Sequence, residues 1–317
     1  LPVLELTQIS MNACAPVLFL VFNRPEQTRR VFAAIRAARP QRLYVAADGP
    51  RPDRPGESER CAEVRTIATA VDWPCELVAL LREQNLGCSE AVSSAVSWFF
   101  NQEAEGIILE DDCLPDGSFF PYCTVQLERW RDDNRVGQIC GFNLLPERSP
   151  SASDYFASHF GWSWGWASWR RAWQSYELTM ASWLRLKKLG LHRQHPFYLE
   201  RIRLFDITAA SGWQASWDYQ WHYALASQGQ LSLIPSVSLV ENIGFTADAT
   251  HTFSADTRRT RPASSLPAPN QWRNPEFLLP DPHYEASLIR AAHAGSFRRR
   301  LKSLLAKPLR RWVRPGR

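Results

Sequence analysis

Three consecutive carboxylates, Glu110, Asp111 and Asp112, are the residues of this sequence best suited to chemistry. They follow the apolar triplet 107–109, which has the composition of a buried strand. Adjacent like charges repel, and burying even one is costly, so the arrangement calls for a positive group nearby. Mg²⁺ or Mn²⁺ prefers such hard oxygen ligands, and usually takes one or two carboxylates together with substrate phosphates. The alternative is that Asp111 and Asp112 are solvated turn residues after a strand.

The elements that must position these carboxylates alternate between strand and helix over the first 110 residues. Short apolar runs that are typical of buried strands cover residues 17–22, 42–47, 76–81 and 106–109. Helical spacing follows the first three runs, at 28–38, at 57–71 and in a segment that Ser89 could cap. This alternation predicts an α/β fold with a parallel sheet covered by helices.

Polar residues follow the other strand-like runs as well, and ligands of such sheets bind beyond the carboxyl ends of the strands. Arg24, Asp48 and Asn85 come after the first three runs, so we expect them to meet the acidic triplet at one edge. Arg24 could pair with phosphates or with surface acids. Asp48 could contact a nucleotide or be an ordinary turn residue, and Asn85 by itself is more typical of a turn. Neither G-x-G-x-x-G nor G-x-x-x-x-G-K-S/T occurs, which argues against a Rossmann dehydrogenase or a P-loop ATPase.

Tryptophans mark the second half of the chain. The stretch FGWSWGWASWRRAW, residues 160–173, contains five of them, and Trp213, Trp217 and Trp221 recur on one helical face. These rings could be core residues, or one or two could line a sugar pocket, because sugar C–H faces stack on aromatic rings. Residues 231–242 predict one or two further strands, and the proline-rich residues 262–282 predict a surface-wrapping segment.

Length and composition narrow the class of protein. The 317 residues, 45 % hydrophobic and 22 % charged, allow one large α/β domain or two smaller ones. No apolar run approaches the roughly 18 to 20 residues that span a bilayer. The opening LPVLELTQIS lacks the basic start and apolar stretch of a signal peptide. Seven cysteines, an odd number without C-x-x-C, favour reduced thiols in a cytosolic protein over disulfides or a zinc site.

The net charge of +5 is due to the C-terminus. Residues 298–317 contain nine Lys or Arg and no acid, so the rest of the chain is mildly acidic. Apolar residues from Phe297 to Leu309 follow helical spacing, which predicts a basic amphipathic tail suited to an anionic membrane surface. A solvated disordered tail or a nucleic-acid contact is the alternative, although we expect no nucleic-acid partner.

The motifs together carry a family resemblance. The order PVLFLVFNRP, ADGPR, NLGCSEAV and GIILEDDCLPDGSFFPYC resembles the GT-A glycosyltransferases, above all bacterial sugar transferases of the family-2-like type. The chain is also similar to the eukaryotic α-mannoside β-1,2-N-acetylglucosaminyltransferases, where E-D-D precedes a similar L-x-P-x-x-F-F-x-Y stretch. The likeness continues through GWSWGWASWRRAW and ASWDYQW and covers about residues 16–252. It implies a GT-A, Rossmann-like, mostly parallel sheet flanked by helices, with a Trp-rich acceptor half.

The resemblance also implies roles for the residues at the strand ends. Asp112 would bind Mn²⁺ or Mg²⁺ directly. Asp111 would contact the ribose or a metal-bound water, and Glu110 would contact the donor sugar. Arg24 and Asp48 would hold the nucleotide.

Further roles fall on the second half of the chain and on the third strand end. Asp218 of SWDYQW matches the family's catalytic base, although it could instead cap its helix. The family's second acid after that base is replaced here by Tyr219, so the acceptor side need not be the same. His251 could reach the metal or diphosphate as a loop closes, although a lone histidine is more often structural. Asn85 would join the nucleotide contacts.

The resemblance implies a metal-dependent, inverting glycosyltransferase, either a hexosyl- or an N-acetylhexosaminyl-transferase. It would use a nucleotide-sugar, UDP-linked, and a glycan or lipid-linked glycan acceptor in cell-surface polysaccharide synthesis. We expect it in the cytoplasm, peripherally at the inner face of the cell membrane. The alternatives are a sugar-phosphate nucleotidyltransferase, which would need a glycine-rich basic loop where FNRPEQT stands, and a non-catalytic carbohydrate-binding protein. The predicted parts are an extension at 1–15, a GT-A domain at 16–260 with nucleotide-sugar (16–115) and acceptor (116–260) halves, a surface-wrapping extension at 261–295 and the tail at 296–317.

Overall fold

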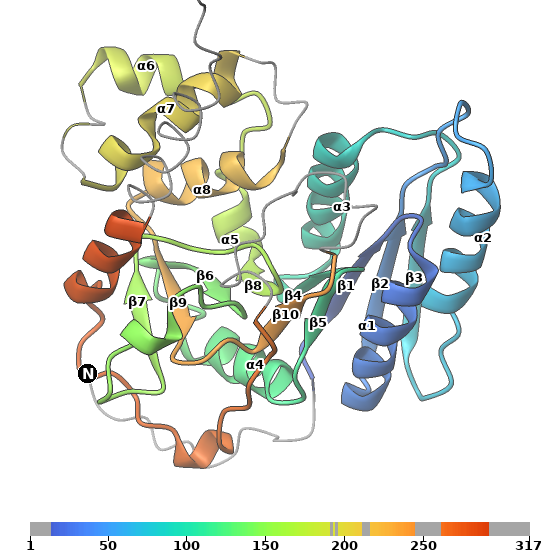
Figure 1. Ribbon diagram of the computed structural model, residues 1–317, viewed down its shortest axis with the longest axis horizontal. Coiled ribbons are helices and arrows are strands. Elements are labelled where there is room, and N and C mark those ends of the chain that lie inside the picture. The colour runs from blue at the N-terminus through green and yellow to red at the C-terminus, as the bar shows by residue number, and fades with distance from the viewer. Residues whose placement is uncertain (1–13, 191–192, 194–195, 211–215, 245–260, 292–317) are drawn as a thin grey trace, which may run out of the picture.

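The apolar run VLFLV forms strand β1 (Val17–Val21), and all five of its residues are buried. Such a run has no polar face, so it is stable only where both faces of the sheet are covered. A computed structural model describes residues 14–190, 193, 196–210, 216–244 and 261–291. In it, β1 lies inside an eight-stranded sheet with helices on both sides (Figure 1).

The first half of the sheet is parallel, as predicted. Its other strands are β2 (Arg42–Ala47), β3 (Glu76–Leu81) and β4 (Glu105–Glu110). They lie in the order β3-β2-β1-β4, and Leu20 pairs with both Ala46 and Glu110. The carboxyl ends of the strands are therefore aligned at one edge.

The connecting helices are α1 (Pro25–Ala38), α2 (Glu57–Ala68) and α3 (Cys88–Gln102). Pro25 occupies the first position of α1, where its fixed φ and missing N–H are tolerated. The prediction that Ser89 caps α3 is wrong. Gly87, with φ of 79°, makes the turn into the helix, and Ser89 lies inside the first helical turn. Its hydroxyl donates to the carbonyl of Ser216 instead.

The second half of the sheet is mixed. Its strands are β6 (Val136–Cys140), β7 (Tyr155–Ser158), β8 (Trp166–Trp169) and β9 (Leu231–Pro235). The full order is β3-β2-β1-β4-β8-β6-β9-β7, and β8 runs antiparallel to both β4 and β6. A separate two-stranded sheet pairs β5 (Cys113–Pro115) with β10 (Val240–Asn242). Residues 231–242 thus form two strands, in two different sheets.

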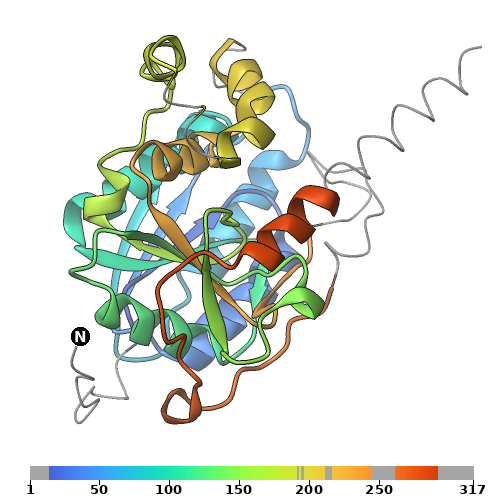
Figure 2. The same cartoon turned by 90° about the vertical axis from the view of Figure 1, so that its left-hand side faces the viewer.

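Helices cover the sheet in two layers, with a third group beyond its far end (Figures 1 and 2). The remaining ones are α4 (Phe119–Arg129), α5 (Arg170–Trp173), α6 (Trp183–Lys188), α7 (Pro196–Ala210), α8 (Asp218–Ser227), two 3₁₀ turns, η1 (Pro146–Arg148) and η3 (Pro269–Gln271), and a helix at 282–291. Helices α1, α2 and α4 share one apolar core, and α3, α5 and α8 share the core on the opposite face. A third core lies beneath α6, α7 and the 282–291 helix.

Most of the described tryptophans belong to these cores. Trp166, Trp169 and Trp221 are almost fully buried, whereas Trp162 and Trp164 are partly exposed. Of the five tryptophans in the first stretch, only Trp162 and Trp164 could offer a ring face to a ligand, because Trp173 is buried as well. Trp213 lies outside the described residues.

The segment after residue 261 is anchored to the rest of the molecule. Its Leu266 and Trp272 are buried, and Tyr284 of the 282–291 helix packs against Phe156 with ring centroids 4.7 Å apart. All seven cysteines are free thiols, as expected. Across the described ranges no helix is both long and apolar enough to cross a bilayer. His251, residues 1–13 and the basic tail lie outside the described residues.

Candidate functional site

The acidic triplet lies at the carboxyl end of β4, next to the end of β1. The Phe22 N–H donates to Asp111 Oδ2 at 3.2 Å. The Arg24 guanidinium lies 2.7 Å from Asp112 Oδ2 and 3.7 Å from Asp111 Oδ1. Arg24 therefore supplies a positive group beside the acids, of the kind expected from the sequence.

One arginine does not neutralise this cluster. Burial, followed by the charges of Asp112, Asp111 and Asp218, raises the pKa of Glu110 well above its usual range. Burial and the neighbouring Asp112 likewise raise the pKa of Asp111 to about 7. Arg24 opposes both shifts but does not cancel them. The site therefore favours a bound cation, which would relieve the repulsion.

Asp218 approaches this cluster from the other half of the chain. It is the first residue of α8, and Trp217 in the cap position has helical dihedral angles. The helix begins without a side-chain capping bond, so the capping interpretation of Asp218 is not supported. Its carboxylate instead accepts a hydrogen bond from the Ser216 hydroxyl. The structure thus brings the candidate base near the acidic triplet.

Cys88 also faces the carboxylates, and the sequence analysis did not single it out. Although the residue is exposed, the protein around it removes water from the thiol, and this desolvation, then the charges of Glu110, Asp218 and Asp112, raises its pKa to about 12. It is the first residue of α3, at the end of the loop that follows β3. Its place in the motif NLGCSEAV was the signal that could have found it.

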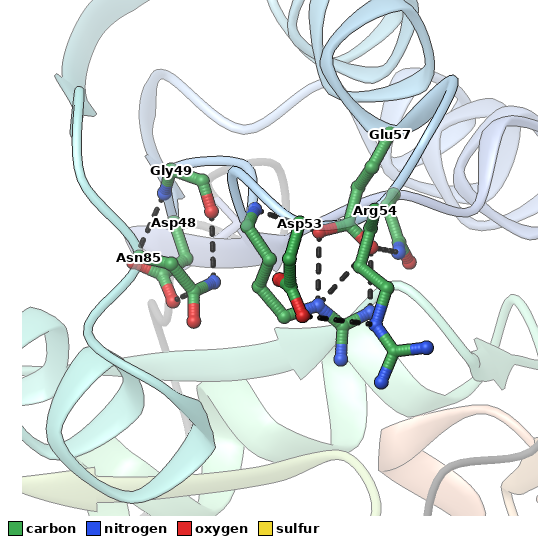
Figure 3. Close-up of polar contacts among 8 residues, drawn as sticks. Asp48, Gly49, Asp53, Arg54, Glu57 and Asn85 are labelled. Carbon is green, nitrogen blue, oxygen red and sulfur yellow. Dashed lines mark hydrogen bonds and ion pairs between the residues drawn. The ribbon is translucent and has the colours of Figure 1, made fainter.

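Asp48 and Asn85 lie together, but they bind the protein itself (Figure 3). The Asp48 carboxylate accepts hydrogen bonds from Asn85 Nδ2 at 3.0 Å and from the N–H groups of Gly49, Leu86 and Gly87 at 3.0 to 3.1 Å. Burial raises its pKa despite these bonds. Asp48 therefore fixes the loop that leads into α3, and the roles of both residues toward a nucleotide remain predictions.

Glu57, a second residue not foreseen, is a buried acid beside this loop, and Figure 3 shows it next to Arg54 and Asp53. It accepts from Asn23 Nδ2 at 2.8 Å and from the Arg51 N–H at 2.8 Å and side chain at 2.5 to 3.2 Å. The Arg51 guanidinium lowers the pKa of Glu57 to about 2. Arg51 also lies 5.5 Å from the centre of the Phe22 ring. Glu57 thus ties the loop after β2 to the end of β1.

Gly244 closes the site on the side of Asp112. Pairing of β10 with β5 brings this segment alongside, and the Ile243 N–H donates to the Asp112 carbonyl at 2.8 Å. A Cβ on Gly244 would lie 2.3 Å from Asp112 Oδ2, closer than any van der Waals contact allows. Only glycine therefore fits beside this carboxylate oxygen without displacing it.

The carboxylates of the acidic triplet are the type of ligand that a hard divalent ion such as Mg²⁺ or Mn²⁺ prefers, and such ions often take only one or two of them from the protein. Within the described ranges no three Asp, Glu, His or Cys side chains are grouped to hold a metal ion. The prediction that Asp112 binds such an ion, with substrate phosphate oxygens completing the ligand set, remains a prediction. Two surface hollows of about 450 and 410 Å³ lie elsewhere, lined around Ser182 and around Arg171, and neither contains a residue of the acidic cluster.

Comparison with known proteins gives weak similarities. No family model matches the chain, and no curated protein matches it in sequence. Among solved structures, HddC from Yersinia pseudotuberculosis is 9 % identical over 51 % of this chain and 80 % of that chain, with a TM-score of 0.31. Mouse xyloside xylosyltransferase 1 in its apo form is 10 % identical over 67 % of this chain and 81 % of that chain, with a TM-score of 0.34. Scores this low support no argument about function, so the mixed α/β fold class rests on the sheet topology itself.

Proposed function

We propose that the protein is a metal-dependent, inverting glycosyltransferase that moves a hexosyl or N-acetylhexosaminyl group from a UDP-sugar to a glycan acceptor. One observation carries the proposal. The triplet Glu110 to Asp112 lies at the carboxyl end of β4 against Arg24 from the end of β1, and the charge of Asp218, distant in sequence, is near enough to act on Glu110. This is an excess of negative charge where a diphosphate and its cation would bind.

In the proposed reaction Asp218 takes the proton of the acceptor hydroxyl while that oxygen attacks the anomeric carbon. The bond from the anomeric carbon to the diphosphate oxygen breaks, and UDP leaves with the bonding electrons. Asp112 would hold Mn²⁺ or Mg²⁺, which when bound supplies positive charge against the leaving diphosphate. Arg24, which lies beside Asp112, would contact phosphate oxygens of the donor.

The remaining strand-end residues have supporting roles in this proposal. Asp111 would contact the ribose or a metal-bound water, and Glu110 would contact the donor sugar. Asp48 and Asn85 would bind the nucleotide through the loop that they stabilise. His251, which lies outside the described residues, would contact the metal or the diphosphate.

The test is turnover of UDP-sugars by the purified protein, measured as release of UDP with and without Mn²⁺. We expect Asp112→Asn to remove metal-dependent turnover without loss of folding, and Asp132→Asn, an exposed acid, to keep it. Asp218→Asn should retain metal-dependent UDP binding while kcat falls about 10² to 10⁴-fold, since only proton transfer is removed. Full turnover in excess EDTA would contradict the metal, and a product of retained anomeric configuration would contradict the base. UDP-sugar binding without any turnover would favour a carbohydrate-binding protein.

We further propose that the acceptor is lipid-linked and that the protein works at the inner face of the cell membrane. The basic tail at 296–317 supports this from the sequence. Within the described residues, one face of α6 and its C-cap carries Leu184 and Leu189, which are 69 % and 67 % exposed, beside the exposed Arg185 and Lys188. Exposed leucines among cations match the surface of an anionic bilayer.

A further inference from the structure

We propose that Ser89 and Ser216 are positioning residues that fix the Asp218 carboxylate from the donor side of the site. This inference rests on the proposed function, because Asp218 matters only as the base of that reaction.

Two hydrogen bonds in series carry the proposal. The hydroxyl of Ser89, a residue only 2 % exposed, donates to the carbonyl of Ser216 at 3.0 Å, across 127 positions of sequence. The hydroxyl of Ser216 in turn donates to Asp218 Oδ1. The first bond fixes the backbone two residues before Asp218, and the second fixes its carboxylate.

The residue between them is fixed independently. The Trp217 ring is 3 % exposed and stacks on Trp166, with centroids 5.8 Å apart and planes at 26°. Its carbonyl accepts a hydrogen bond from the Tyr176 hydroxyl at 3.2 Å. Because ring and carbonyl of Trp217 are both held, the freedom left to Asp218 is the rotation of its own side chain. The Ser216 hydroxyl restricts that rotation.

The serine contacts connect the base to the donor half. Ser89 follows Gly87, and the N–H groups of Leu86 and Gly87 donate to the Asp48 carboxylate. Hydrogen bonds therefore lead from the end of β2, through the start of α3, to Asp218. The bonds of the two serines involve neither Arg24 nor Asp112, so their loss should affect kcat and leave metal-dependent donor binding intact.

Two variants remove the contacts and two serve as controls. Ser89→Ala and Ser216→Ala each delete one hydroxyl, while Ser216→Thr keeps a hydroxyl at a half-buried position. Ser168→Ala is matched for stability, because the Ser168 hydroxyl is also buried and donates to a backbone carbonyl, Gly137, at 2.7 Å. That bond lies on the sheet and does not involve Asp218.

The first measurement does not depend on activity. Amide hydrogen exchange of a peptide covering 216–221 should accelerate about threefold to tenfold in Ser89→Ala, as loss of one hydrogen bond predicts. The same peptide should exchange at the wild-type rate in Ser168→Ala. Unchanged exchange in Ser89→Ala would overturn the proposal.

The second measurement uses a UDP-sugar with Mn²⁺. We expect kcat to fall about tenfold in Ser89→Ala and Ser216→Ala with KM for the donor within about twofold, and Ser216→Thr to recover. Adding Ser89→Ala to Asp218→Asn should not lower kcat further, because the carboxylate that Ser89 helps to position is already absent. Additive losses, or an equal loss in Ser168→Ala, would show a purely structural role and overturn the proposal. Faster exchange in Ser89→Ala with no UDP-sugar turnover by the wild type would instead overturn the proposed function while the contact to Ser216 stands.

Discussion

The Arg24 guanidinium lies 2.7 Å from the Asp112 carboxylate although 88 positions separate the two residues in sequence. The contact joins the end of β1 to the end of β4, so it depends on the parallel pairing of those strands. Asp112 thus has Arg24 on one side and Gly244 on the other, so a substitution at either position would change its surroundings.

Gly244→Ala should lower metal-dependent turnover at least about tenfold, since its methyl would displace Asp112 Oδ2, the oxygen proposed to bind the ion. The matched control is Gly117→Ala, where a Cβ would meet nothing within 4 Å and φ is not positive. The measurement is turnover as a function of Mn²⁺ concentration, and the concentration needed for half-maximal rate should rise in Gly244→Ala. Equal Mn²⁺ dependence in both variants would show that Asp112 is not the ligand.

Asp111→Asn should stabilise the metal-free protein at neutral pH. The pKa of Asp111 rises from 3.8 to about 7 on folding, so the folded state binds the proton more tightly than the unfolded state. The contribution of Asp111 to the free energy of unfolding is fully present below about pH 4 and is lost as the pH rises toward 7. Asparagine cannot ionise, so thermal unfolding in EDTA should show a Tm gain of about 3 °C or more at pH 8 and little at pH 4. A gain that is the same at both pH values would contradict the ionisation argument.

Glu57→Ala should destabilise the protein by about 2 kcal/mol, because it leaves Asn23 and Arg51 without their shared buried acceptor. Glu59→Ala, an exposed acid on the same helix, is the control. The lowered pKa, about 2, means that the Glu57 contribution is present above its unfolded value of 4.5 and is lost as the pH falls toward 2. Urea unfolding at pH 7 and pH 3 should therefore show a smaller difference from wild type at pH 3.

The full chain should co-sediment with anionic vesicles at low salt and dissociate at high salt, because each cation near the surface is worth about 1 kcal/mol. A chain ending before Ser296 should bind much more weakly. In that shortened chain, Leu184→Ser with Leu189→Ser should lower the residual binding. Phe277→Ser with Leu279→Ser, at positions 66 % and 69 % exposed, is the control and should not lower it. Equal binding by the full and shortened chains would show that the tail is not the anchor.

The parallel half of the fold could be predicted because its strand pairs follow from the alternation of apolar runs and helical segments along the first 110 residues. A buried apolar run, a helix and a second run allow essentially one arrangement, so the meeting of Arg24 with the acidic triplet followed from their positions alone. The insertion of β8 between β4 and β6 could not be predicted in the same way. Its residues, Trp166 to Trp169, pair with strands on both sides that lie far away in sequence.

The individual contacts of the site were less predictable than their location. Serine is a residue type preferred at the start of a helix, which suggested a capping role for Ser89. The residues around Ser89 in sequence cannot show that its hydroxyl donates to the carbonyl of Ser216 instead. Gly244 has no side chain to draw notice, and its role depends on the pairing of β10 with β5. Asp48 was expected to face a ligand, yet four protein donors use its oxygens. Polar residues at strand ends thus indicate where a site lies better than which of them binds.

The position of β8 has a consequence for the order in which the chain folds. Strands β1 to β4 need only the first 110 residues and can assemble while the rest is still being synthesised. From that moment β4 has an unpaired edge until residues 166–169 emerge, and β6 acquires its second neighbour only with residues 231–235. An exposed strand edge is a template for pairing with other chains. The interval between the synthesis of residues 110 and 169 is therefore when the nascent protein is most exposed to aggregation, and when a chaperone would protect it most effectively.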